Sequence, residues 1–427
     1  MGATWRCALT LTGLLASVLV AGATTAEPTV IVLSWDGVAG HQIDRAQLPG
    51  LTRVAREGVR AETLTPPFPS STFPSHATLA TGTYPDRHGI VANHFIDPMR
   101  SGDTEFDYDA DANWFEAEPL WIAAERQGVR SAVFFWVGAE TDWRGQRAQL
   151  RRAPFDSGVD EREKVDQILA WLDLPEDERP RLILSYWRGS DRAGHRHGPD
   201  SEEVDRALRG QDAQLVRLLA GLDAREAWPD TTLLIVSDHG MTEVTEAVDA
   251  GAVIKRAGVN ARVIHSSAVA NIHLDAPSDP GAKRRAIAAF DGIEGVVAHD
   301  ALRTPAALRY RHPSRVGQVV AIARPPVVFR SGLRGWGQQL SWALGGSTGA
   351  HGFEPDSVPR MGAVLLAVGR GTGQGARLPA ARAIDIAATV AALLGIDPPA
   401  QSEGRAIDLR GEPPKPSASP TTAGQAG

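Results

Sequence analysis

The stretch Thr29-Val-Ile-Val-Leu-Ser34, followed by Trp35-Asp36-Gly37, decides the fold class. A short apolar run rich in β-branched residues favours a buried strand, and the glycine after it favours a turn. Four more such runs follow along the chain, and amphipathic helical patterns separate them. The runs are Ser131–Trp136, Arg181–Tyr186, Thr232–Ser237 and Ala363–Val368, and the helical stretches are His41–Glu57, Leu120–Gln127, Arg162–Leu172, Glu202–Leu222 and Ile384–Leu394. This alternation predicts an α/β fold with a mostly parallel central sheet and helices on both faces.

The region from about Val263 to Pro326 has a different pattern. Its strand-like runs, Ala268–Leu274 and Gln318–Ala323, are short, and Pro and Gly interrupt the region often. We therefore predict a small α+β subdomain at 263–326, inserted between two parts of a catalytic core at 27–262 and 327–410. The tail at 411–427 is rich in Pro, Ser, Thr, Ala and Gly, a composition typical of disorder.

Residues 1–26 have the pattern of a signal peptide. Arg6 supplies a short basic region, the stretch from Ala8 to Ala21 is apolar, and Thr24-Thr-Ala26 offers small residues for cleavage. The alternative, an uncleaved membrane anchor, is disfavoured because the apolar run is short for a bilayer. We predict an exported bacterial protein, either periplasmic or secreted.

The composition limits the chemistry. Of the 427 residues, 43% are hydrophobic and 22% are charged, as in a soluble globular enzyme. The formal net charge of −7 gives no general attraction to nucleic acid or to an anionic membrane. We therefore expect a small-molecule substrate, no nucleic acid polymer and no stable membrane partner. The only cysteine, Cys7, lies in the predicted leader, which excludes a cysteine-based zinc site and a cysteine nucleophile in the mature chain.

Polar loops adjoin four of the strand runs. An aspartate follows the first run, an Asp-x-x-x-His pattern follows the third, an Asp-His-Gly turn follows the fourth, and a Gly-x-His-Gly-Phe pattern precedes the fifth. The carboxyl ends of parallel strands meet at one edge of a sheet, where ligands bind. Carboxylate and imidazole side chains without cysteine suit divalent metals, with zinc the leading case. The candidate ligands are Asp36, Asp191, His195, Asp238, His239 and His351.

A candidate nucleophile lies in Thr72-Phe-Pro-Ser-His-Ala-Thr-Leu-Ala-Thr-Gly82. We predict that Thr72 stands just before a helix initiated by Pro74, where free N–H groups and the helix dipole favour an incoming phosphate. A hydroxyl needs a base or a metal to activate it. Six ligands plus Thr72 suit two four-coordinate ions that leave room for substrate. We expect His76, on the same helix, to pack or hydrogen-bond rather than to bind metal.

From about Thr29 to Pro398, this ordered set of motifs resembles the nucleotide pyrophosphatase/phosphodiesterase family of the alkaline phosphatase superfamily. The resemblance implies an alkaline-phosphatase-like fold with two zinc ions per chain. It also implies that Thr72 is the metal-activated nucleophile and that Asn93, from His88-Gly-Ile-Val-Ala-Asn93, hydrogen-bonds a nonbridging phosphate oxygen. One zinc would be held by Asp36, Thr72, Asp238 and His239, and the other by Asp191, His195 and His351.

The family stacks a nucleobase between two aromatic residues, which correspond here to Phe73 and Phe155. Phe155 lacks the hydroxyl of the family's tyrosine. Three more positions depart from the family pattern: Ser71 replaces a frequent Lys, Ser75 replaces an Asn, and Val137 replaces the Pro of Phe-Trp-Pro-Gly. These departures bear on substrate preference and leave the reaction class intact.

The sequence therefore predicts an exported two-zinc enzyme that cleaves phosphodiester or phosphoanhydride bonds through a phosphothreonine intermediate and releases nucleoside monophosphates. No Arg or Lys occurs from Ser70 to Tyr84, which favours diesters because a monoester dianion calls for an extra cation. Alternatives within the fold are a phosphomonoesterase, a phosphonate hydrolase and a lipid-headgroup phosphodiesterase. The alternative that is not an enzyme is a non-catalytic zinc-binding protein. The oligomeric state is left open.

Overall fold

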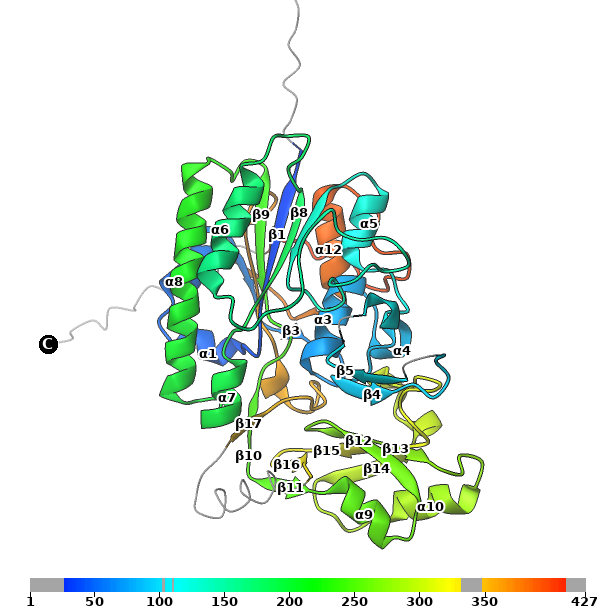
Figure 1. Ribbon diagram of the computed structural model, residues 1–427. Helices are drawn as coiled ribbons and strands as arrows, with labels where there is room; N and C mark the ends of the chain where they lie inside the picture. The colour runs from blue at the N-terminus through cyan, green and yellow to red at the C-terminus, as the bar shows by residue number, and fades with distance from the viewer. Residues whose placement is uncertain (1–26, 102–103, 110, 332–347, 412–427) are drawn as a thin grey trace, which may run out of the picture.

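The computed structural model describes residues 27–101, 104–109, 111–331 and 348–411, and an eight-stranded sheet lies at its centre (Figure 1). In spatial order the strands are β19 (Ala376–Leu378), β2 (Val59–Ala61), β18 (Leu365–Gly369), β9 (Thr231–Val236), β1 (Thr29–Trp35), β8 (Leu182–Trp187), β6 (Ser131–Phe134) and β7 (Leu150–Arg152). All neighbours from β9 to β7 are parallel, whereas β18 runs antiparallel to both β9 and β2. The predicted mostly parallel sheet is confirmed.

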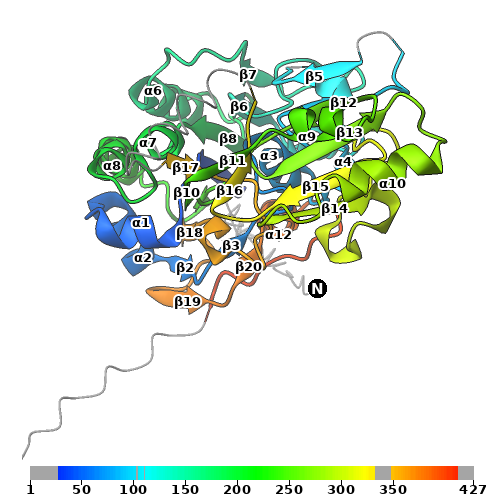
Figure 2. The ribbon, with the colours of Figure 1, turned by 90° about the horizontal axis from the view of Figure 1, so that it is seen from below.

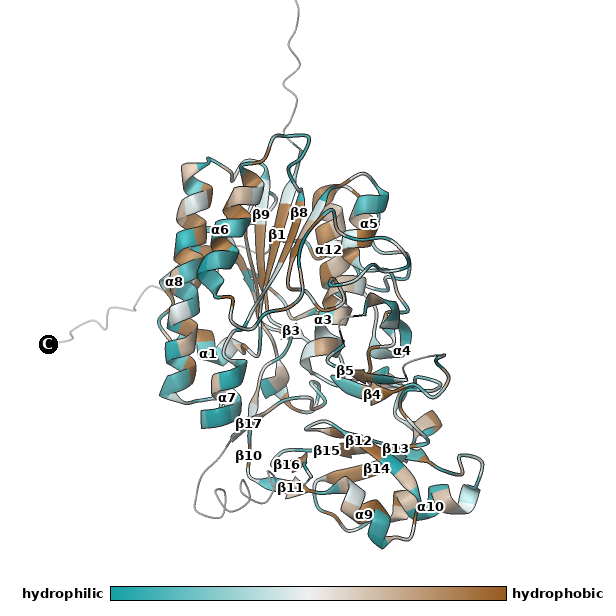
Figure 3. Cartoon of the chain, in the orientation of Figure 1, coloured by the Kyte–Doolittle hydropathy of each residue, from teal (hydrophilic) through white to brown (hydrophobic). Residues whose placement is uncertain are grey.

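Helices cover both faces of this sheet because its central strands are apolar on both sides. In β1, Val30 and Val32 pack into one core cluster, whereas Ile31 and Leu33 pack into the other. Figure 3 shows the strands as a hydrophobic layer between helices whose outer faces are hydrophilic. One face carries α1 (Gly40–Arg45), α2 (Pro49–Glu57), α6 (Glu161–Leu172) and α8 (Glu202–Ala224); the other carries α3 (Thr72–Thr81), α5 (Leu120–Arg126) and α12 (Asp385–Leu394).

The stretch His41–Glu57, predicted as one helical pattern, forms two helices. Helix α1 ends at Arg45, and α2 begins at Pro49. Proline has no N–H to donate and disfavours a helical conformation in the residue before it, and Leu48 is accordingly extended, with φ −110° and ψ 94°. Pro49 therefore starts a new helix, as it can at a first helical position.

A second, antiparallel sheet forms a smaller lobe below the first in Figure 1, and Figure 2 views it from beneath. Its helices α9 and α10 pack on the sheet, and its core draws on side chains from Ala250 to Phe329, beyond both ends of the predicted insert at 263–326. The division into core and insert stays a prediction. The lobe contains α9 (Ala250–Arg256), β12 (Ala261–His265), β13 (Val269–Leu274), α10 (Pro280–Ala288), β14 (Val296–Asp300) and β15 (Val319–Ala323), in the sheet order β12-β13-β15-β14.

Short elements join the two sheets and complete the chain. The pairs β10 with β17 and β11 with β16 connect the main sheet to the lobe. These elements are β3 (Leu64–Thr65), α4 (Pro85–His88), β4 (His94–Ile96), β5 (Glu105–Asp107), α7 (Asp191–His197), β10 (Thr242–Val244), β11 (Glu246–Val248), β16 (Val327–Phe329), β17 (Thr348–Ala350) and β20 (Ala381–Arg382).

A buried arginine also ties the lobe to the core. Arg315 is 4% exposed, and its Nη1 donates to the carbonyl oxygen of Gly89 at 2.7 Å. Its Nε donates to Asp97 at 2.8 Å, and its Nη2 lies 2.8 Å from Glu116. Gly89 begins the turn that leads to Asn93, so this turn is held from the side of the lobe.

The predicted signal peptide and almost all of the predicted tail lie outside the described residues. Among the helices that are described, none is long and apolar enough to cross a bilayer.

The start of α2 is capped from another helix. Its N-terminal neighbour Leu48 offers no side-chain acceptor, but Asp212 of α8 accepts from the N–H of Gly50 at 2.8 Å and of Leu51 at 2.9 Å. Asp212 is 1% exposed, so these bonds are shielded from water. They satisfy two of the N–H groups that every helix leaves unpaired at its start.

We predict that Asp212→Ala lowers the free energy of unfolding by about 1–3 kcal/mol, because it leaves two buried donors unpaired. Arg206→Ala, at an exposed position on the same helix, should change it by less than about 0.5 kcal/mol. Urea unfolding followed by circular dichroism measures both. Equal stability of the two variants would contradict the capping role.

Candidate active site

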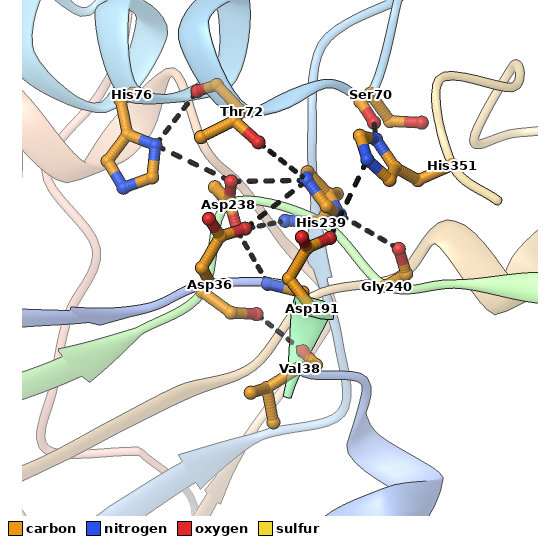
Figure 4. Close-up of polar contacts among 12 residues, drawn as sticks. Asp36, Val38, Ser70, Thr72, His76, Asp191, Asp238, His239, Gly240 and His351 are labelled. Atoms are coloured by element: carbon orange, nitrogen blue, oxygen red, sulfur yellow. Dashed lines mark hydrogen bonds and ion pairs between the residues drawn. The ribbon is translucent and has the colours of Figure 1, made fainter. Parts of the chain in front are cut away.

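Six acidic and imidazole side chains converge at the carboxyl edge of the parallel strands. They come from the loop after β1, from α7 after β8, from the loop after β9 and from the segment after β17. Together with the start of α3, they form one cluster; Figure 4 labels its members except for His195. The structure thus brings together every residue singled out as a metal ligand: Asp36, Thr72, Asp191, His195, Asp238, His239 and His351.

The loops that carry two of the carboxylates interlock through their backbones. The carbonyl oxygen of Asp36 accepts from the N–H groups of Ser190 and Asp191, at 3.0 and 3.2 Å. Gly189, with φ +56°, lies so close that a Cβ there would stand 1.9 Å from this oxygen. Glycine is required at this turn because any side chain would push the two loops apart.

The first group of atoms surrounds the ring nitrogen Nε2 of His239. This atom lies 3.2 Å from Asp238 Oδ2, 3.5 Å from Asp36 Oδ1 and 3.3 Å from the Thr72 hydroxyl oxygen. The carboxylate and imidazole atoms all lie within 4.8 Å of one another, which is close enough to share one ion. The threonine hydroxyl therefore faces a candidate metal position directly.

The second group adjoins the first. Nε2 of His195 lies 3.3 Å from Asp191 Oδ1 and 3.0 Å from Nε2 of His351, and His351 Nε2 lies 3.6 Å from the same carboxylate oxygen. The ring of His239 stacks on that of His351, with centroids 3.8 Å apart. His239 is also within 4.8 Å of Asp191 and His351, so it stands between the two groups.

Backbone carbonyl groups orient all three imidazoles. The Nδ1 atoms of His195, His239 and His351 lie 2.9, 2.9 and 3.1 Å from the carbonyl oxygens of Gly349, Gly240 and Ser70. A carbonyl can only accept, so each Nδ1 carries the proton and each Nε2 lone pair points into the cluster. Metal-binding histidines show this same arrangement.

Three carboxylate oxygens in the cluster are buried without a hydrogen-bond donor among the described residues. They are Oδ1 of Asp36, Oδ1 of Asp191 and Oδ2 of Asp238. Burial, together with the charges of Asp238 and Asp191, raises the pKa of Asp36 well above its ordinary value. Buried polar atoms normally have partners. Divalent cations at this position would supply them, so the donor set fits metal binding.

Burial and the neighbouring rings of His239 and His195 hold the pKa of His351 well below its ordinary value. This imidazole is therefore neutral near pH 7, which is the form that binds a metal ion.

The helix that carries Thr72 starts earlier than the sequence predicted. Thr72 is the first residue of α3 and Pro74 is the third, so the expectation of a helix initiated by Pro74 was wrong. A proline costs no hydrogen bond at the third position either, because the first four N–H groups have no partner within a helix. The N–H of Phe73 is not free for a phosphate, because it donates to Asn93 Oδ1 at 2.9 Å.

This bond fixes the amide of Asn93. With the oxygen occupied by Phe73, the amide nitrogen of Asn93 is the remaining donor, 3.4 Å from the Tyr108 hydroxyl. Asn93 and Thr72 both line one cavity of about 430 Å³. The side-chain N–H₂ group can therefore donate to an oxygen of a ligand bound beside Thr72.

His76 does not face the cluster as a ligand. It is fully buried; its Nδ1 donates to the carbonyl oxygen of Thr72 at 2.8 Å, and its Nε2 lies 2.9 Å from the Ser34 hydroxyl. The Nδ1 bond lies within α3, and the Nε2 contact joins α3 to β1. Nδ1 also lies 3.5 Å from Asp238 Oδ2, so His76 borders the cluster as a packing and hydrogen-bonding residue, as the sequence led us to expect.

Aromatic side chains form the outer part of the same cavity. Phe73 packs edge-on against Tyr108, and Phe155, which is 46% exposed, packs edge-on against Phe135 and Tyr186. Both Phe73 and Phe155 line the cavity, as base stacking would require. No Lys or Arg is among the described residues that line it.

Sequence reasoning missed two tyrosines of this site. The hydroxyl of Tyr186 donates to Asp36 Oδ2 at 2.7 Å, and Tyr108 lines the cavity beside Asn93. Tyr186 sits at the end of β8, and its position in the parallel register opposite Ser34 could have placed it near Asp36. Nothing in the sequence around Tyr108 points to the site.

Comparison with known proteins identifies the family. A sequence profile described as type I phosphodiesterase/nucleotide pyrophosphatase matches residues 30–354. The chain belongs to this family. The resemblance drawn from the motifs is confirmed, and with it the alkaline-phosphatase-like fold.

Several type I phosphodiesterase/nucleotide pyrophosphatases share part of this sequence. An uncharacterized pyrophosphatase/phosphodiesterase of Schizosaccharomyces pombe is 38% identical over 229 residues, which are 53% of this chain and 47% of the yeast protein. An ectonucleotide pyrophosphatase/phosphodiesterase of Caenorhabditis elegans is 30% identical over 311 residues, 71% of this chain and 40% of the worm protein. Human ectonucleotide pyrophosphatase/phosphodiesterase family member 1 is 31% identical over 220 residues, which are 51% of this chain and 24% of the human protein. The match spans less than half the length of each relative.

A solved structure of the family covers more of the chain. Murine ectonucleotide pyrophosphatase/phosphodiesterase 5, an inactive threonine-to-alanine variant in complex with AMP, superposes with a TM-score of 0.77 at 25% identity. The superposition covers 87% of this chain and 96% of the murine chain.

We predict that Tyr186→Phe weakens the affinity for a divalent metal by about 10-fold or more, because the Asp36 carboxylate loses the donor that orients it. Competition between the protein and a chromophoric chelator for Zn²⁺ measures this. Tyr310→Phe, which removes a buried hydroxyl bonded to Asn271 in the smaller lobe, is the matched control and should leave the affinity unchanged. Equal affinities of the two variants would show that the Tyr186 hydroxyl does not support the site.

Proposed function

We propose that the protein is an exported, two-zinc phosphodiesterase/nucleotide pyrophosphatase. It hydrolyses phosphodiester or phosphoanhydride bonds through a phosphothreonine intermediate and releases nucleoside monophosphates. The observation that carries the proposal is the position of the Thr72 hydroxyl, 3.3 Å from His239 Nε2 and next to carboxylate oxygens that lack donors. The substrate class is supported by the family and by the AMP bound to the murine relative.

The ligand sets follow the two groups of atoms. Asp36, Thr72, Asp238 and His239 would hold one zinc ion. The other ion would be held by Asp191, His195 and His351. When bound, the ions supply positive charge that lowers the pKa of the threonine hydroxyl and stabilises the phosphoryl oxygens and the leaving oxygen.

The side chains of this protein then account for the two steps. Oγ1 of Thr72 bonds to phosphorus as the bond to the leaving oxygen breaks. The amide of Asn93 donates to a nonbridging oxygen, since its own carbonyl is occupied by the Phe73 N–H. Water then cleaves the threonine ester, which restores the hydroxyl and releases the monophosphate.

The shape and charge of the cavity support a diester of a nucleotide. Phe73 and Phe155 offer ring surfaces to a base, and the absence of Lys and Arg among the described lining residues gives no extra cation for a monoester dianion.

Export rests on the pattern of residues 1–26. It is tested by the N-terminal sequence of the protein recovered from the periplasm or medium of a bacterial host.

We predict that Thr72→Ala reduces hydrolysis of bis(p-nitrophenyl) phosphate by at least about 1000-fold, because the nucleophile is lost. Thr52→Ala, an exposed threonine on α2, should retain full activity. The wild-type protein should prefer this diester to p-nitrophenyl phosphate, which has the same leaving group. A preference for the monoester would favour a phosphomonoesterase. Faster turnover of a phosphonate ester or of a glycerophosphodiester would favour a phosphonate hydrolase or a lipid-headgroup phosphodiesterase, respectively.

We predict two zinc ions per chain by elemental analysis of the purified protein. A chelator should abolish diester hydrolysis, and added zinc should restore it. The double variant Asp238→Ala/His239→Ala should retain one ion, whereas Thr72→Ala should retain both. A Thr72→Ala protein that binds zinc and turns over at the wild-type rate would support a non-catalytic role for the metal centre.

A further inference from the structure

A second cavity, of about 600 Å³, is lined by Arg192, Ala193 and Arg196 of α7, which are not members of the metal cluster. It is bounded by α6, α7 and α8, which lie together at the left of Figure 1. It shares no lining residue with the substrate cavity. We call it the arginine groove, after the side chains that line it: Arg162, Arg188, Arg192, Arg196 and Arg206.

The charge of the groove is opposite to that of the whole chain. Five arginines and three acidic residues line it, whereas the chain carries a net charge of −7. Two of the acids are engaged: Asp160 caps α6 by accepting from the N–H of Glu163, and Glu161 pairs with Lys164 and Arg188. The third is Glu203.

Four of the arginine side chains have no partner within the described part of the chain. Only Arg188 pairs with an acid; no hydrogen bond or ion pair engages the guanidinium groups of Arg162, Arg192, Arg196 and Arg206. Arg192 and Arg196 are exposed and stand four residues apart on α7, so they project from one side of this helix. Guanidinium groups without a partner can bind the oxygens of a phosphate.

A buried amide also belongs to the lining of the groove. Gln211, also in the lining of the groove, is 5% exposed. Its Oε1 accepts from the N–H of Gly189 at 2.8 Å, which fixes the side chain, but its Nε2 is buried without any acceptor among the described residues. Buried donors are normally paired.

We propose that the arginine groove binds a small phosphate monoester at a site separate from the metal centre. Helix α7 divides the two sites, because Asp191 and His195 face the metal cluster while Arg192 and Arg196 line the groove. Both sites can therefore be occupied at once. The groove does not depend on the metal ions, so its existence is independent of the proposed hydrolysis.

Equilibrium dialysis of the zinc-loaded protein with AMP tests this proposal. We expect two AMP molecules per wild-type chain, one at the metal centre and one in the groove. Arg192→Gln/Arg196→Gln should weaken the second binding event by at least about 100-fold, because two charge-assisted contacts are lost. The control variant Arg377→Gln/Arg382→Gln loses the same two charges at exposed positions outside the groove. It should bind AMP as the wild-type protein does.

Three further arms separate the possible outcomes. Asp238→Ala/His239→Ala should lose only the AMP at the metal centre and keep the AMP in the groove. If this variant still binds two AMP molecules, the result counts against the proposed function, and binding in the groove can still be measured. Inorganic phosphate should compete for the groove, and adenosine should not bind it. The proposal is overturned if Arg192→Gln/Arg196→Gln binds AMP as the wild type does, or if adenosine binds the groove as tightly as AMP. Thermal unfolding of each variant confirms that it is folded.

Discussion

Three carboxylates, those of Asp36, Asp191 and Asp238, crowd together in a buried position at one edge of the main sheet. Like charges at such short range repel one another strongly when water is excluded. The fold nevertheless brings them together, through parallel strands that end at the same edge and loops that interlock at Gly189. Positive charge among the carboxylates, or a proton on Asp36, whose pKa is raised, relieves this repulsion. The cluster is therefore the constraint from which the rest of the site follows.

The surroundings of the cluster are organised to receive that charge. Each imidazole donates its Nδ1 proton to a backbone carbonyl, and Tyr186 donates to the outer oxygen of Asp36. What faces inward is then a set of lone pairs and the hydroxyl of Thr72. Since backbone groups set these orientations, substitutions remote from the cluster that shift Ser70, Gly240 or Gly349 would also disturb it.

The sequence predicted those parts of the protein that depend on local patterns. Strands β1 and β9 and the polar residues after them were predictable because a buried parallel strand is a continuous apolar run. The start of α3 was misplaced, because a proline fits the first or the third helical position equally well. The role of Tyr186 depends on strand register, and that of Tyr108 on tertiary packing, so neither has a local signature. The extent of the smaller lobe, which draws in α9, depends likewise on packing between distant segments.

The buried Arg315 has a consequence for how the two sheets behave together. Its guanidinium holds the carbonyl of Gly89, at the start of the turn that carries Asn93, so opening of the lobe removes a support of the turn. Withdrawal of this arginine would leave the buried carboxylate of Asp97 without its partner, which makes separate opening of the lobe costly. The lobe and the turn that carries Asn93 therefore form one cooperative unit, and amide exchange from His88 to Asn93 would report the opening of a lobe whose arginine lies 226 residues from Gly89 in sequence.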